Sequence, residues 1–269
     1  MMHEVNLQEI IDYAKCPMYY YFKYKVPELK TDKINTIEKY DKDIHSVVYY
    51  AFSRIQEGKD IEIKDIKASW GRAWIKDKRK SNIIFGENLM TKDTYNERRR
   101  KGLDSLLNFQ SEFNINPGFP IAINQEYKLQ VSKNLIIKNN FEVIRTIDDV
   151  YGKRTEIMTF KTDEHTNNKI VKEFDLRLLA NGIAAKELLN LNDINHTMYH
   201  IDKSSKVTYT NQELNTDFFY YSVTNIFKAM YNNLYYMNSD NTCYTCIYKD
   251  ICSNKAKVMQ LLDKEEKTC

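Results

Sequence analysis

The chain has 269 residues, of which 42% are hydrophobic and 29% are charged, a balance typical of a folded globular protein and not of a disordered one. With 40 Lys and Arg against 37 Asp and Glu, the formal net charge of +3 is too small to indicate a partner by itself. No G-x-G-x-x-G or G-x-x-x-x-G-K-[ST] loop occurs, which disfavours a dinucleotide-binding or P-loop enzyme.

The chain shows no targeting or membrane signal. No segment has 18 uninterrupted apolar residues, and acidic side chains interrupt Met1–Lys15, which therefore lacks the apolar core of a signal peptide. We expect a soluble, cytoplasmic protein that does not enter a membrane. We also expect a single domain, 1–269, with a helical part at 1–116, a sheet core at 117–209 and a C-terminal helix with clustered cysteines at 210–269.

Helices are predicted throughout the first part of the chain. The first begins at Asn6, which has the spacing of a capping box with Glu9. The second spans Lys39–Gln56, where apolar residues recur with the 3.6-residue period of a helix. A third surrounds Trp70, and a fourth covers Lys92–Phe113.

Pro117-Gly118 marks a loop, after which the pattern changes to the period of two that is typical of strands. Strands are expected at Ile121–Val131, Leu135–Ile137, Phe141–Val150 and Thr155–Lys161, with turns near Asn139-Asn140 and Gly152-Lys153. We then expect a buried helix from Phe174 to Leu188, a hairpin around Ser204-Ser205, and an aromatic helix from a second capping box at Thr210 and Glu213 to about Met237. This order predicts an α/β (α+β) fold with a mixed central sheet flanked by helices.

The cysteines carry the strongest chemical signal. Cys243, Cys246 and Cys252 read C-x2-C-x5-C. In a reducing compartment such a cluster more often binds metal than forms disulfides, and closely spaced thiolates can wrap one centre. If Cys16 joined them, a four-thiolate clasp would tie the two ends of the chain together. Ordinary buried thiols are the alternative, and Cys269 is expected to be a spare thiol.

Candidate catalytic residues fall on the predicted strands. Asp148 ends one apolar strand, and alternation places Thr159 and Lys161 on one face of the next. Acidic oxygens hold Mg²⁺ or Mn²⁺ in phosphodiester hydrolysis, and a nearby Lys orients or deprotonates the attacking water. We therefore predict that Asp148 and Lys161 converge at a sheet edge, with His45 and Glu126 as further catalytic and metal-binding residues. The alternatives are a turn-capping Asp148, solvated Lys161 and Glu126 side chains, and an exposed or core His45.

Five motifs stand in order along most of the chain: Leu7-x5-Tyr13-x2-Cys16-Pro17, His45-x6-Phe52, Ile147-Asp148-Asp149-Val150, Phe160-Lys161-Thr162 and Cys243-x2-Cys246-x5-Cys252. In this order they resemble the RecB-type branch of the PD-(D/E)XK nuclease superfamily that carries an iron–sulfur cluster, as in AddB nuclease domains and CRISPR-adaptation exonucleases. The resemblance implies a restriction-endonuclease-like core, a metal-binding Asp148, a water-positioning Lys161 and a [4Fe–4S] cluster on the four cysteines. Zinc also suits four thiolates, and only the resemblance favours iron–sulfur over it.

The sequence departs from the family at the active site. Two residues before the Lys, where the family has an acid, stands Thr159, whose neutral hydroxyl is a weaker ligand for a hard cation. Glu156 falls on the opposite strand face, and Arg145 replaces a usual Gly. The Gln-x3-Tyr pattern of the following helix is also missing.

These observations leave two main functional hypotheses. The first is a DNA-processing nuclease of exonuclease type that uses Mg²⁺ or Mn²⁺ on single-stranded DNA or duplex ends. The second is a catalytically degenerate nuclease fold that serves as a nucleic-acid-binding or assembly subunit. Either would work with a protein partner in replication, recombination or repair. A zinc-stapled binding protein unrelated to nucleases is a third reading.

Two basic runs bear on these hypotheses. Lys76–Lys80 and Arg98–Lys101 are typical of solvated helix faces, and their functional reading is contact with nucleic-acid phosphates. The surplus of aromatic residues, with 20 Tyr and 12 Phe, would stack on single-stranded bases or fill the core.

Overall fold

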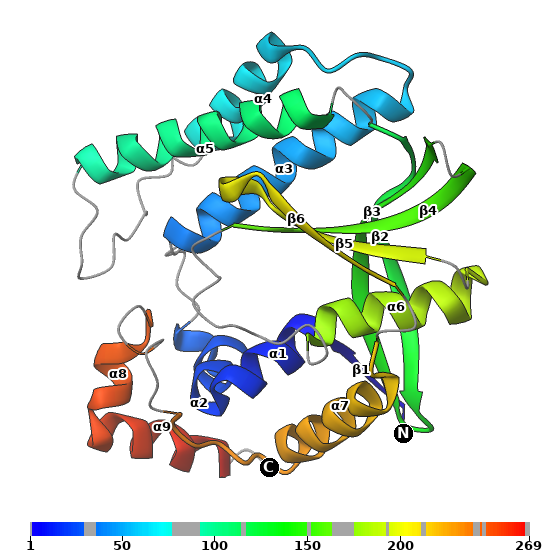
Figure 1. The fold of residues 1–269 in the computed structure, drawn as a ribbon. Helices are drawn as coiled ribbons and strands as arrows, with labels where there is room; N and C mark the ends of the chain where they lie inside the picture. Colours follow the sequence, from blue (N-terminus) through cyan, green and yellow to red (C-terminus); the bar gives the residue numbers. More distant parts are fainter. Residues whose placement is uncertain are drawn as a thin grey trace.

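The computed structural model describes residues 2–29, 36–76, 92–113, 117–149, 152–162, 175–191, 194–210, 214–238, 243 and 246–266. Within these ranges, a six-stranded mixed sheet lies between two groups of helices (Figure 1). The predicted fold class, a mixed central sheet flanked by helices, is confirmed.

The centre of the sheet is an antiparallel meander. Its strands are β2 (Phe119–Ser132), β3 (Leu135–Asp149) and β4 (Gly152–Lys161). Helix α6 (Leu176–Leu189) then leads to β5 (Ile194–His200), which runs parallel to β4 and pairs with antiparallel β6 (Ser205–Thr210). The short strand β1 (His3–Asn6) pairs in parallel with the first residues of β3.

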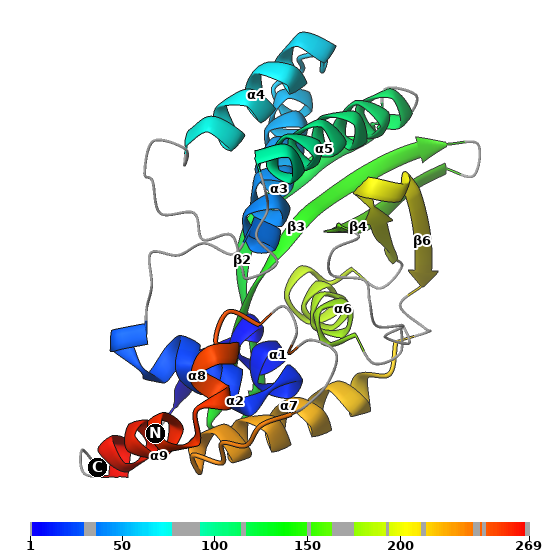
Figure 2. The same cartoon turned by 90° about the vertical axis from the view of Figure 1, so that its left-hand side faces the viewer.

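Helices cover both faces of this sheet, as Figure 2 shows from the side. One face is packed by α3 (Thr36–Gln56), α4 (Ile63–Lys76) and α5 (Lys92–Phe113), whose buried side chains include Phe52, Trp70 and Phe109. The other face is packed by α1 (Leu7–Lys15), α6 and α7 (Thr216–Tyr231), with Leu7, Leu179 and Phe219 at its centre. None of the helices in the described ranges has the length and apolarity needed to cross a membrane.

A third, smaller core joins the two ends of the chain. It is formed by α2 (Pro17–Tyr20), a π-helical turn (Tyr21–Lys25), α8 (Lys249–Ser253) and α9 (Lys255–Glu266). Short 3-10 turns lie at Pro27–Leu29 and Ile201–Lys203. Hydrogen bonds reinforce the junction, because the Tyr21 hydroxyl donates to the Leu261 carbonyl at 2.9 Å and the Met18 N–H donates to the Tyr236 carbonyl at 3.2 Å.

The helix starts follow the expected signals in part. Asn6 is the N-cap of α1, but its side-chain amide donates to the Glu9 carboxylate at 3.1 Å and does not cap the backbone. The second predicted capping box is wrong, because Thr210 still belongs to β6. Helix α7 instead begins after Asn215, whose side chain accepts a hydrogen bond from the Phe218 N–H at 3.0 Å.

The loop before the meander was expected at Pro117-Gly118, and a glycine is required there. Gly118 has a φ of 60°, and a Cβ added to it would lie 2.6 Å from the Thr146 carbonyl oxygen. The turn expected at Asn139-Asn140 is wrong, since β3 runs unbroken through it. The predicted helix start at Phe174 lies outside the described residues.

Candidate functional site

The sheet opens at the point where β3 and β4 stop pairing. The ladder between them extends from Asp149 opposite Gly152 to Val143 opposite Met158. Further along, the same edge of β3 pairs with β1 and no longer with β4. This separation leaves main-chain groups of β4 available to side chains, and polar residues from β3, β4, α3 and α6 gather around the gap.

Glu142 of β3 fills the gap, and its side chain is only 8% exposed. Its carboxylate accepts a hydrogen bond from the Phe160 N–H at 2.7 Å, and it lies 3.5 Å from His45 Nε2 and 3.6 Å from Arg177 Nη1. Burial alone would raise the pKa of Glu142, but His45, Arg177 and the Phe160 N–H together lower it below its ordinary value. Glu142 is therefore a buried carboxylate with its charge already balanced.

His45, on α3, was predicted as a metal ligand and lies beside Glu142. Its Nδ1 is 2.7 Å from the Asp41 carbonyl oxygen, and its Nε2 is 3.2 Å from the Phe160 carbonyl oxygen. Burial alone would lower its pKa, but Glu142 and Asp41 raise it to about 9. Both ring nitrogens face acceptors, so the protonated imidazolium fits this environment. A metal ligand would have to be the neutral ring.

Lys161, at the end of β4, is also in this cluster. Its ammonium group pairs with Asp175 Oδ2 at 2.7 Å. Asp175 is the N-cap of α6, and its Oδ1 accepts from the N–H groups of Arg177 and Leu178 at 3.0 and 3.1 Å. Burial alone would raise the pKa of Asp175, but Lys161 and the α6 N–H groups lower it. Lys161 is thus held by an ion pair at the position predicted to orient water.

Thr159 lies on the buried side of β4, where the resemblance implies an acid. Its hydroxyl is 3.5 Å from Asn181 Nδ2 on α6. Asn181 Oδ1 in turn accepts from the Tyr127 hydroxyl at 2.8 Å and from Asn139 Nδ2 at 3.1 Å. This part of the cluster is therefore a neutral hydrogen-bond network.

Arg177 connects the cluster to the N-terminal helices. Its guanidinium group lies against Glu142 and also donates to Gln8 Oε1 of α1 at 2.6 Å. Cations and carboxylates are equal in number across the cluster, with His45, Lys161 and Arg177 facing Asp41, Glu142 and Asp175.

This donor set does not fit a hard divalent cation. Such an ion is bound mainly by carboxylates and other oxygens, whereas here the central carboxylate already has two cationic neighbours and an N–H donor. This donor set supports no catalytic step through Mg²⁺ or Mn²⁺.

The structure does not bring the other two predicted residues to this cluster. Asp148 is exposed and pairs in register with Lys153, six residues along β3 from Glu142, which is about 20 Å in an extended strand. Its predicted convergence with Lys161 is wrong, because β3 and β4 turn back immediately after Asp149. Glu126 is exposed on β2, where Lys138 is a charged neighbour.

Glu142 was missed because it stands inside an apolar run, Phe141-Glu142-Val143-Ile144. An acid in such a run is a signal for a buried charge with a partner. Glu156 is expected on the face of β4 opposite Thr159; it pairs with Arg145 Nε at 2.6 Å, whereas the Thr159 hydroxyl lies near Asn181 of α6.

The four clustered cysteines lie in one neighbourhood. Cys16 separates α1 from α2, and it packs with Cys246 and Cys252 in the small core that joins the chain ends. Burial, together with smaller contributions from Cys16, Cys243 and Cys252, raises the pKa of the Cys246 thiol to about 11. The chemistry of these donors, all thiols beside an apolar core, suits a cluster or a soft metal ion. Cys269 lies outside the described residues.

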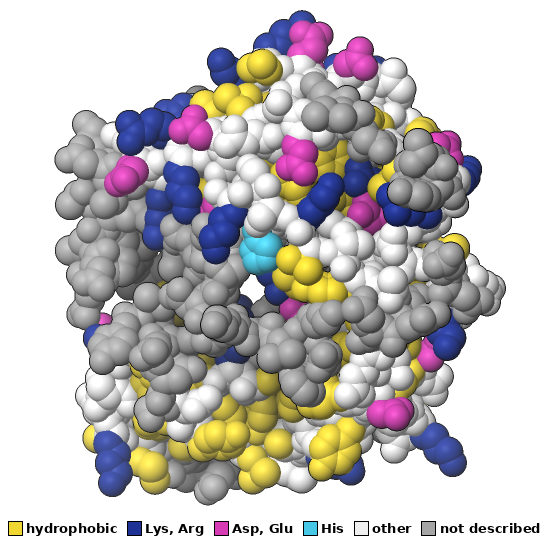
Figure 3. All heavy atoms as spheres, viewed as in Figure 1, with side chains coloured by type: hydrophobic (Ala, Val, Ile, Leu, Met, Phe, Trp, Pro, Cys, Tyr) yellow, Lys and Arg dark blue, Asp and Glu magenta, His cyan; other side chains and the backbone are white. Residues whose placement is uncertain are grey.

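The basic run on α5 is at the surface. Arg99 and Arg100 are exposed, while Lys101 pairs with the buried Asp202 carboxylate at 3.2 Å. Figure 3 shows dark-blue side chains gathering at the upper left, in the region of α5, with a few acidic side chains among them. The side chains of Lys76–Lys80 lie outside the described part of the chain.

Comparison with known proteins gives no family. No protein-family model matches the chain, and no curated protein is detectably similar to it. The functional argument therefore depends on the geometry described above.

Proposed function

We propose that this chain is a nucleic-acid-binding protein with a nuclease-like fold in which an internal ion-pair network replaces the catalytic metal site. The observation that carries the proposal is the environment of Glu142. This carboxylate lies where β3 and β4 separate, between the cationic side chains of His45 and Arg177, with Thr159 in place of the expected acid.

The nuclease-like part of the proposal is supported by how the motif residues are placed. A helical His45, the strand carboxylate Glu142 and Lys161 on the next strand lie around one opening in the sheet. The resemblance implies His45 and Lys161, but it implies Asp148 and not Glu142 as the carboxylate. The helix α6 that follows completes the cluster through Asp175 and Arg177. A restriction-endonuclease-like core accounts for this arrangement.

Binding is proposed to depend on cations outside the cluster. The cluster is electrically balanced, so it offers little net attraction for phosphate. Arg99 and Arg100 on α5 are exposed and lie outside the ion-pair cluster, so they are suited to contact a phosphate backbone.

The proposal includes a [4Fe–4S] cluster on Cys16, Cys243, Cys246 and Cys252. When bound, such a cluster would cross-link the chain ends, and the protein's own contribution is the apolar packing of Met18 and the neighbouring small core around the thiols. Zinc on the same thiols is the alternative, and the metal content of purified protein separates the two.

An active nuclease is the second candidate. The gathering of His45, Glu142 and Lys161 in one opening favours it. For hydrolysis, Arg177 would have to leave Glu142 so that a divalent ion could take its place, and Thr159 would have to serve as a weak ligand.

The test is to incubate anaerobically purified protein with end-labelled single- and double-stranded DNA, with Mg²⁺, with Mn²⁺ or with EDTA. We expect retention of the DNA in a gel-shift assay that EDTA does not change, and no cleavage. Metal-dependent cleavage that disappears in Glu142→Gln, but persists in the exposed control Glu126→Gln, would instead establish the nuclease.

A further inference from the structure

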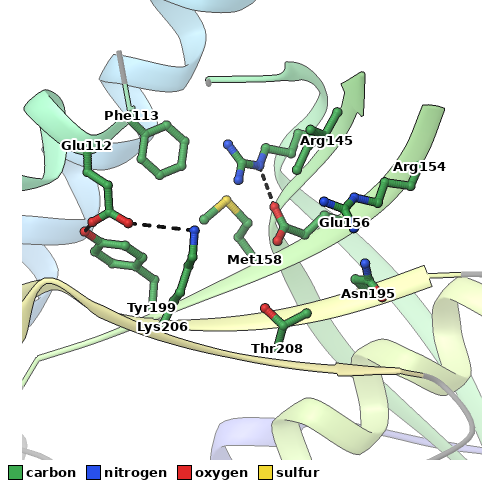
Figure 4. Close-up of a pocket in the computed structure, with 11 residues that line it drawn as sticks. Glu112, Phe113, Arg145, Arg154, Glu156, Met158, Asn195, Tyr199, Lys206 and Thr208 are labelled. Atoms are coloured by element: carbon green, nitrogen blue, oxygen red, sulfur yellow. Dashed lines mark hydrogen bonds and ion pairs between the residues drawn. The ribbon is translucent and has the colours of Figure 1, made fainter. Parts of the chain in front are cut away.

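A second site lies away from the ion-pair cluster. A pocket of about 430 Å³ opens between the C-terminal end of α5 and strands β3 to β6 (Figure 4). This volume is within the range of pockets that hold small molecules. None of Glu142, His45 or Lys161 lines it, so the pocket is separate from the candidate nuclease position.

The base of the pocket is a buried ion pair. Arg145 of β3 and Glu156 of β4 are directly opposite in register, and their side chains are only 7% and 9% exposed. Arg145 Nη1 also donates to the Pro117 carbonyl at 2.8 Å, and its guanidinium group lies 4.6 Å from the centre of the Phe113 ring. These contacts hold the guanidinium group in place beside the pocket. Burying this ion pair costs desolvation free energy that apolar side chains of similar size would not cost.

The other end of the pocket is polar and more accessible. Glu112 accepts a hydrogen bond from the Tyr199 hydroxyl and lies 3.8 Å from Lys206 Nζ. Figure 4 shows the ends of Lys206 and Arg145 directed towards the same space beside Met158. A buried ion pair at one end of the pocket and accessible polar side chains at the other therefore face the same space.

The lining indicates the chemistry of the ligand. Cationic side chains (Arg145, Arg154 and Lys206) outnumber the carboxylates (Glu112 and Glu156) by one, which favours an anion. Phe113, Ile147 and Met158 form the apolar part of the lining, and Asn195 and Thr208 supply hydrogen-bonding groups. The volume is much larger than a bare inorganic anion needs.

We propose that this pocket binds a nucleoside monophosphate unit, with the phosphate near Lys206 and Arg154 and the base against Met158 and Phe113. The unit is either a free nucleotide or the 5′-phosphorylated end of a strand. Binding of a 5′-phosphorylated strand end rests on the proposed nucleic-acid binding, whereas binding of a free nucleotide does not.

The test is isothermal titration calorimetry of the full chain with deoxyadenosine 5′-monophosphate. Deoxyadenosine and inorganic phosphate are the separate-part controls, and a short oligodeoxynucleotide with and without a 5′-phosphate distinguishes the two sources. The pocket variant is Arg154→Gln/Lys206→Gln, whose side chains are exposed. The matched variant is Lys133→Gln/Lys186→Gln, which removes the same charge from exposed positions outside the pocket.

We expect saturable binding of the monophosphate that is at least about tenfold tighter than binding of either part, with a loss of about tenfold or more in the pocket variant only. Absence of saturable binding, or equal affinity in both variants, would overturn the proposal. If the oligodeoxynucleotide binds while the monophosphate does not, the pocket proposal fails and the proposed function stands. If the monophosphate binds and no oligodeoxynucleotide does, the pocket holds a free nucleotide and the proposed function fails.

Discussion

At the scale of single residues, the central feature is a carboxylate that is stabilised by its neighbours. Glu142→Gln keeps the shape of the side chain but leaves His45 and Arg177 without their anion. We expect the free energy of unfolding to fall by about 3 kcal/mol, since breaking a buried ion pair on one side leaves a charge uncompensated.

Urea unfolding checks this expectation, and the matched control is Glu126→Gln on the surface of β2. The control is expected to change the unfolding free energy by no more than about 0.5 kcal/mol. Equal stability of the two variants would show that the buried pairs contribute nothing.

His45 gives the cluster a pH dependence whose sign follows from its pKa. The folded protein raises this pKa from its ordinary value of 6.5 to about 9. The contribution of His45 to stability is therefore complete below about pH 6.5, declines above it, and is lost as the pH rises through 9. We expect the unfolding free energy of wild type, minus that of His45→Gln, to decrease between pH 6.5 and pH 9. A constant difference would mean that His45 is not protonated in the folded protein.

The sequence indicates some of these residues and conceals others for physical reasons. His45 and Lys161 could be predicted because a motif order places them, and the structure brings both to one opening. Asp148 was predicted and Glu142 was missed because the position of the hairpin turn sets which residues face each other. A shift of a few residues in that turn would place a different acid of β3 opposite a given residue of β4. No local sequence pattern determines the position of the turn.

At the scale of elements, long periodic segments could be predicted and short or interrupted ones could not. The period of α3 and the loop at Gly118 were both readable from side-chain pattern and turn chemistry. The four-residue strand β1 has no signal of its own and forms because β3 offers it an edge. The Asn139-Asn140 pair is typical of a turn, yet Asn139 remains in β3, where its amide donates to Tyr127 and Asn181.

Helix α5 is the element that we expect to carry the nucleic-acid contacts. Arg99→Gln/Arg100→Gln would remove two phosphate contacts, so the slope of log K against log salt for single-stranded DNA is expected to become shallower by about 1.4. Filter-binding measurements over a series of salt concentrations provide the slope. Lys133→Gln/Lys186→Gln is the matched control, and an equal change in both variants would remove α5 from the interface.

At the scale of the whole molecule, the two ends of the chain are fastened to each other. Besides the cysteines, Asn238 Nδ2 donates to the Lys15 carbonyl at 2.9 Å, and the Tyr13 hydroxyl donates to the Leu234 carbonyl. This junction brings the first and last motifs of the sequence to one small core although most of the chain separates them.

Cys246→Ser tests the cysteine clasp. We expect loss of bound iron and of brown colour, together with a lower melting temperature, because the ligand set is incomplete and the chain ends are less constrained. Iron analysis, absorbance spectra and thermal unfolding measure these effects, with Cys269→Ser as the control. A Cys246→Ser protein that stays brown and equally stable would refute the clasp, and stoichiometric zinc without iron would identify the other metal.

Titration of the protein with Mn²⁺, with free Mn²⁺ followed by electron paramagnetic resonance, shows directly whether Glu142 binds a divalent ion. Wild type is expected to bind no Mn²⁺ at the Glu142 position, because His45 and Arg177 already balance that carboxylate. Thr159→Asp/Arg177→Gln, which restores the acid and removes the internal cation, is expected to gain one site. Tight stoichiometric binding of Mn²⁺ by wild type that Glu142→Gln abolishes would contradict the proposed loss of the metal site. It would indicate a metal-dependent nuclease instead.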